Sequence, residues 1–184
     1  MVDQTASQPY RPSRTYRLIA TSLVRARGAL AHAAAFGLVH ATLVTLITIH
    51  GIGARDMAFG SRSMELISTF ALGSALGGFA AWIVAAVVVA ARPVTARFAG
   101  MLLALSVGTA GGIATIYFVA FTSYFQNVHE GMSLLQYVVG FVFATASVAY
   151  TFAASGAPLL MPWGVVPLIG GAAAFAHLAG SRSG

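Results

Sequence analysis

The feature that most limits what this chain can fold into is a set of long apolar stretches without charge. Four of them, at about 29–50, 65–91, 98–125 and 134–154, contain a single charged residue, Glu65. A helix needs roughly 20 apolar residues to cross the hydrocarbon core of a bilayer. Only 8% of all residues are charged, too few to cover the surface of a water-soluble domain. The pattern predicts an all-α fold, a polytopic bundle of transmembrane helices.

A further apolar segment at about 164–180 leaves the number of spans at four or five. The stretch 158–179 carries no formal charge and is long enough to cross a bilayer. Pro158, Pro162 and Pro167 weaken a continuous helix over that length. Two interpretations stand: a short fifth span, or a re-entrant or interfacial segment.

The charge distribution divides the chain into a head and one membrane domain. We expect 1–28 to form a polar tail and a basic amphipathic segment that lies on the membrane surface, and 29–184 to form the helical domain. The arginines predicted to contact anionic lipid are Arg14, Arg17, Arg25 and Arg27. Half of the ten arginines precede the first span, so the positive charge indicates a lipid surface and not a nucleic-acid partner.

The same arginines predict the orientation and the location. Basic residues concentrate on the cytoplasmic side of membrane proteins, so the N-terminus is expected inside the cell. All ten basic residues are arginine and none is lysine. We interpret this usage as GC-rich coding, and therefore expect a bacterial inner membrane.

Small residues four positions apart mark a close helix contact. Gly73 and Gly77 lie in the second span, and Gly108 and Gly112 lie in the third. Such spacing lets two helix backbones approach closely. The glycines fit a dimerisation face of a homo-oligomer, or packing between the second and third spans of one chain, and we favour the second interpretation.

His40 is the ionisable residue nearest the middle of a predicted span. No Asp, Glu or Arg lies at that depth, which argues against an ion-coupled pump and against a carboxylate-bridged di-iron centre. An ionisable side chain within a span is a functional candidate. The alternative is a neutral imidazole that bonds a threonine or a carbonyl of a neighbouring helix.

Other histidines and acids are predicted to collect at the outer side. This group comprises His50, Asp56, Glu65, His129 and Glu130, with His177 added if the last segment is a fifth span that runs outward. Imidazole and carboxylate are suitable ligands for zinc or copper. The spacing matches no recognised metal motif, and charged residues also collect wherever loops meet water.

The sequence contains no phosphate-binding loop, nucleophile elbow or H-E-x-x-H pair, so no catalytic residue is predicted and no cofactor is identified. Three hypotheses remain, in order of preference. The first is an accessory, assembly or structural subunit with protein partners in a larger membrane complex. The second is a small oligomeric transporter or channel with polar groups such as His40 and Thr115 along its path. The third is a metal-binding or redox subunit that uses the outer histidines.

Overall fold

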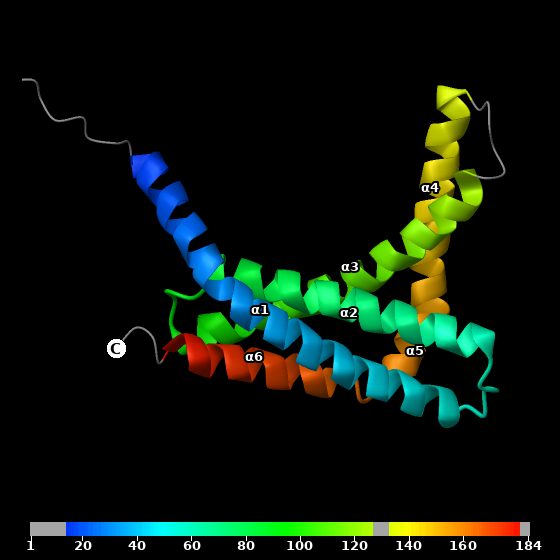
Figure 1. Cartoon of the computed structure of the whole chain (residues 1–184), viewed down its shortest axis with the longest axis horizontal. Coiled ribbons are helices and arrows are strands. Elements are labelled where there is room, and N and C mark those ends of the chain that lie inside the picture. The colour runs from blue at the N-terminus through cyan, green and yellow to red at the C-terminus, as the bar shows by residue number, and fades with distance from the viewer. Residues whose placement is uncertain (1–13, 127–132, 181–184) are drawn as a thin grey trace, which may run out of the picture.

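Helices account for nearly all of the described chain. A computed structural model describes residues 14–126 and 133–180, and within them there are helices and connecting turns but no strand. The elements in chain order are α1 (Arg14–Gly53), α2 (Ser61–Val88), α3 (Val94–Gln126), α4 (Leu134–Thr151), the π-helix η1 (Phe152–Gly156), α5 (Ala157–Leu160) and α6 (Val165–Gly180). Figure 1 shows the second half of α1, α2, the first part of α3, and α6 running side by side, while α4 lies next to the last part of α3 at one end.

Four stretches of helix are long and apolar enough to cross a membrane. They are Leu30–Gly53, Ser61–Val88, Val94–Ser123 and Leu134–Leu160. The last apolar segment forms the shorter helix α6, whose 16 residues extend over about 24 Å at 1.5 Å per residue. That length falls below the roughly 30 Å of a hydrocarbon core. The predicted all-helical fold is present with four candidate spans, and α6 does not qualify as a fifth by length.

Helix boundaries extend beyond the apolar stretches that the sequence predicts. α1 is one helix of 40 residues that continues through the predicted boundary at residue 28, because no proline follows Pro12 until Pro93. α2 begins at Ser61 instead of residue 65, and α3 begins at Val94 instead of residue 98. Charge ends an apolar stretch, but it does not interrupt the hydrogen bonds of a helix.

Glycines bring the α2 and α3 backbones into direct contact. A Cβ atom on Gly77 would overlap the carbonyl group of Gly108, and one on Gly112 would overlap the carbonyl oxygen of Gly73. A Cβ atom on Gly108 would lie 2.6 Å from the carbonyl oxygen of Gly77. The structure thus shows these glycines packing within one chain, between α2 and α3.

The main core lies where α1, α2, α3 and α6 meet. Trp82 of α2 contacts Phe175 of α6 edge to face, with ring centroids 5.1 Å apart, and contacts Phe36 of α1 at 4.9 Å. Met101 and Leu105 of α3 are fully buried in the same cluster. This core fixes the position of α6 along the bundle.

α4 begins with a capping box and ends in an irregular region. The Ser133 side chain accepts a hydrogen bond from the backbone of Gln136, whose side chain accepts one from the backbone of Ser133 at 2.9 Å. α4 then passes into η1 and α5, and the backbone becomes extended at Met161. Arg55 at the end of α1 donates to the carbonyl of Pro158, which holds α5 against α1.

Candidate functional site around His40

The imidazole of His40 is buried between three helices. Only 2% of the residue is exposed, and its Nε2 lies 2.9 Å from the Oγ1 of Thr109 in α3. The Phe36 ring stacks on the imidazole with 8° between the planes. A Cβ atom on Gly78 of α2 would lie 3.2 Å from the imidazole Cδ2. The structure therefore shows the second arrangement that the sequence allowed, an imidazole bonded to a threonine of a neighbouring helix.

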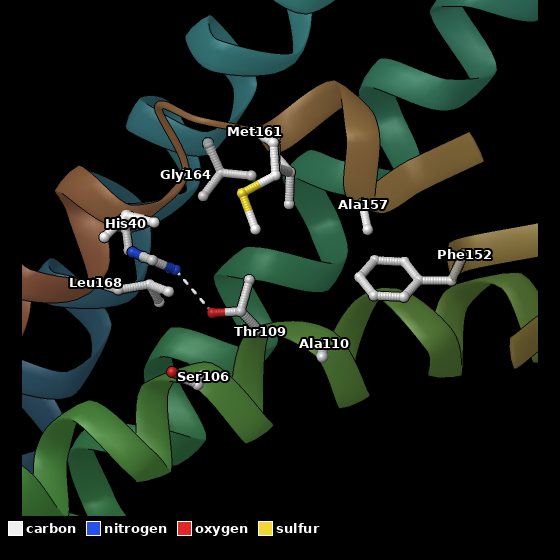
Figure 2. A pocket seen from close by; sticks show the side chains of 12 residues that line it. His40, Ser106, Thr109, Ala110, Phe152, Ala157, Met161, Gly164 and Leu168 are labelled. Atoms are coloured by element: carbon white, nitrogen blue, oxygen red, sulfur yellow. Dashed lines mark hydrogen bonds between the residues drawn. The ribbon is translucent and has the colours of Figure 1, made fainter. Parts of the chain in front are cut away.

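A cavity of about 170 Å³ opens beside this histidine. Its lining is almost entirely apolar and comes from α1, α3, η1, α5, α6 and the turn before α6 (Figure 2). The lining residues are His40, Val44, Ser106, Thr109, Ala110, Phe152, Ala157, Leu160, Met161, Gly164, Val165 and Leu168. A dry apolar cavity of about 150 Å³ holds benzene in an engineered protein, so this space suits one small ring.

One wall of the cavity is the interrupted stretch between α4 and α6. Phe152 belongs to the π-helix, and Met161 and Gly164 belong to the non-helical link. Figure 2 shows Phe152 at one end of the cavity and His40 at the other, with Met161 above the hydrogen bond to Thr109. Single π-helical turns and discontinuous helices recur at functional and binding sites. The His40–Thr109 pair and the interrupted stretch between α4 and α6 thus line the same cavity.

Other hydroxyls of α3 are satisfied by their own helix. Ser106 lines the cavity, but its hydroxyl donates to the carbonyl of Leu102 at 2.8 Å. Thr115 donates to the carbonyl of Gly111 at 2.7 Å and lies on an exposed part of α3. Thr109 is the hydroxyl that reaches His40. No sequence signal distinguishes Thr109 from these other hydroxyls, because the face of α3 that meets α1 is set by how the helices pack.

The predicted outer metal group is not assembled among the described residues. His50 lines a groove with Trp163 and Val166, where α6 begins. His177 lies eleven residues further along α6, about 16 Å away at 1.5 Å per residue. His177 is separated from His50 because α6 runs away from the end of the bundle where His50 lies. The predicted metal group required a last helix that runs toward that end.

Two other members of that group, His129 and Glu130, lie outside the described residues. Asp56 follows α1 in a left-handed backbone conformation, with φ of 49°. Within 14–126 and 133–180, no three His, Asp or Glu residues lie close enough to hold a metal ion.

The predicted lipid-surface arginines all belong to the first half of α1, and their side chains are outside the described part of the structure. They are Arg14, Arg17, Arg25 and Arg27.

Comparison of the chain with protein-family models, curated proteins and solved structures gives no match. The function is therefore argued from the cavity and its surroundings.

Proposed function

We propose that this chain is a small membrane transporter or binding protein for a neutral, mainly apolar molecule that carries one hydrogen-bonding group. The observation that supports this function is the cavity of about 170 Å³ that joins the His40–Thr109 pair to a break in the helices. Binding pockets are mostly apolar, with a few polar groups that orient the ligand. The arrangement around His40 has this composition.

The lining of the cavity predicts what the ligand carries. No acidic or arginine side chain lines it, so an ionised molecule would lose its hydration without a compensating charge. The Nε2 atom of His40 is engaged by Thr109, and the Thr109 hydroxyl keeps further hydrogen-bonding capacity for a single polar group of a ligand. A phenol-like molecule fits the volume and this chemistry.

We further propose the bacterial inner membrane as the location, with the N-terminus in the cytoplasm. Four candidate spans support a membrane location. Arg92 and Arg97 lie in or next to the turn between α2 and α3, on the side where the basic N-terminal segment would also lie. A reporter fused at residue 1 should be active only in the cytoplasm, and activity outside the cell would contradict this orientation.

The binding proposal can be tested with two probes of similar size. Phenol carries one hydroxyl group and toluene carries none. Calorimetry on the purified chain in detergent should show phenol bound more tightly than toluene, by about tenfold if one hydrogen bond of about 1.4 kcal/mol distinguishes them. In proteoliposomes, the chain should accelerate phenol uptake.

A substitution that fills the cavity provides the decisive comparison. Ala157 lines the cavity and Ala174 is exposed on α6. Ala157→Phe should abolish phenol binding, and the matched control Ala174→Phe should leave it unchanged. Equal binding by both variants, or no binding by the wild type, would refute the proposed site.

A second function, the accessory subunit, is favoured by the surface of α4. Only 12% of the most apolar part of Leu134–Leu160 is buried within the chain, compared with 39% for α2. Large side chains such as Phe143 and Tyr150 are 68% and 74% exposed. A helix with so little contact to its own chain has room for a partner subunit or a second copy.

Photo-crosslinking distinguishes a protein partner of α4 from lipid. A photoreactive phenylalanine analogue at Phe143 should form a crosslink to one protein, whereas the same group at Leu103 should not. Leu103 of α3 is 67% exposed and serves as the lipid-facing control. Identical labelling at both positions would remove the support for α4 as a docking helix.

A further inference from the structure

Arg97 is a buried cation without hydrogen-bond partners at two of its nitrogens. The residue lies in the first turn of α3 and is 8% exposed. Its Nε and Nη1 atoms are buried and have no partner within the part of the chain that the structure describes. A guanidinium keeps its charge in proteins and has five donor hydrogens. Leaving such a group unpaired is energetically costly.

Arg97 belongs to the face of α3 that packs into the bundle. Met101 and Leu105 follow it at four-residue intervals, are fully buried, and contact the cluster that contains Trp82 and Phe175. The guanidinium therefore occupies the last position of a buried stripe, at the end of the bundle next to the α2–α3 turn. The side chain of Arg97 does not face open solvent.

The acids in the described residues cannot neutralise this charge. They are Asp56 and Glu65, and both lie at the opposite end of α2. From Glu65 to Val88 the helix rises about 35 Å at 1.5 Å per residue. Interactions over that distance are largely screened where water is present. An anion that compensates the charge of Arg97 therefore has to come from outside the described residues.

We propose that Arg97 binds the phosphate group of an anionic phospholipid at the cytoplasmic surface. Arg97 lies near the end of a candidate span, where lipid headgroups begin. Its fork of donors matches phosphate oxygens in a bidentate geometry. The Nε and Nη1 atoms are covered in this structure, so binding requires the side chain to swing from the buried stripe toward the headgroups, where exposed Arg92 in the preceding turn adds positive potential.

Thermal unfolding in detergent tests this site. The wild type is titrated with phosphatidylglycerol, with phosphatidylcholine, and with inorganic phosphate at the same concentration. Phosphatidylglycerol should raise Tm by about 5 °C at saturation, since a ligand that binds only the folded state stabilises it. Phosphatidylcholine and inorganic phosphate should have much smaller effects. An equal shift with inorganic phosphate would overturn the lipid assignment in favour of a free-phosphate site.

Two variants link the lipid response to the residue. Arg97→Met should abolish the response and raise Tm in lipid-free detergent, because it removes an uncompensated buried charge at similar side-chain length. Arg62→Met is the matched control, since Arg62 is exposed at the opposite end of α2 and the net charge changes equally. A full phosphatidylglycerol response in Arg97→Met would overturn the proposal.

A third variant retains the charge and removes only the fork. Arg97→Lys should fold and should need about ten times more phosphatidylglycerol for the same shift, as expected when one charged hydrogen bond is lost. This variant keeps the test decisive if Arg97→Met does not fold. A wild-type response that phosphatidylcholine matches, or a Lys variant identical to the wild type, would contradict bidentate binding of the phosphate.

Discussion

Two adjacent glycines of α3 allow the contact between α2 and α3 to be measured directly. A Cβ atom on Gly112 would overlap the carbonyl oxygen of Gly73 and would lie 3.1 Å from the backbone nitrogen of Gly77. A Cβ atom on Gly111 would have nothing within 4 Å. Gly112→Ala and Gly111→Ala therefore add the same methyl group to the same helix, once against a backbone and once into open space.

The expected effects have opposite signs. In a helix, alanine is favoured over glycine by about 0.5–1 kcal/mol, so Gly111→Ala should stabilise by that amount. At Gly112 the same gain is opposed by overpacking, which costs about 1–3 kcal/mol and involves backbone atoms that cannot rotate away. The two variants should differ by about 2 kcal/mol in the free energy of unfolding, or about 6 °C in Tm for a chain of this size.

The assay is thermal unfolding of the purified variants in one detergent, followed by circular dichroism and by size-exclusion chromatography. Gly112→Ala should melt below the wild type, and Gly111→Ala should melt at or above it. Equal Tm values for the two variants would show that α2 and α3 are not in backbone contact there. A change of oligomeric state in Gly112→Ala alone would instead assign the glycines to an interface between copies.

Three further substitutions test other contacts. Thr109→Val removes the hydroxyl that pairs with His40 and should destabilise by about 1–3 kcal/mol, measured as a loss of Tm; an unchanged Tm would mean that the imidazole has another partner. Gly51→Ala should weaken the contact between α1 and α5 and increase protease cleavage before α6. The control Gly53→Ala adds a methyl group that meets no atom within 4 Å, so it should not increase cleavage. Equal cleavage of the two variants would contradict the contact between α1 and α5. Ser133→Ala removes the cap of α4 and should cost about 1 kcal/mol, visible as faster amide exchange in its first turn; unchanged exchange would show that the capping box is not formed.

Sequence patterns predict the helices of this chain well because the relevant information is local. Uncharged length identified the four candidate spans, and the capping box of Ser133 and Gln136 at the start of α4 is a local pattern of the same kind. The prolines at 158, 162 and 167 indicated that the last part would be irregular. They did not predict the π-helix at Phe152–Gly156, which precedes the first of these prolines.

The site depended on information that the sequence does not display. His40 was singled out by its depth in a span, but its partner depends on how α1 and α3 are rotated about their axes. Of the α3 hydroxyls, Thr109 faces α1, while Thr115 is exposed and lines a groove between α3 and α4. The placement of His177 depended on the direction of α6, which length and charge left open. The sequence does not single out Arg97, because burial of a helix end is a property of packing.

Backbone-to-backbone packing also restricts how a molecule can reach His40. A Cβ atom on Gly37 of α1 would lie 2.9 Å from the carbonyl oxygen of Ala75 in α2, so the α1 and α2 backbones also approach closely, although less closely than those of α2 and α3. Neither seam leaves room for a ring. The walls that remain are α3, α6, η1 and the Met161–Gly164 link, so the proposed ligand would enter laterally between these elements. The proposed ligand would then be selected first by how well it dissolves in lipid, and only afterwards by the His40–Thr109 pair.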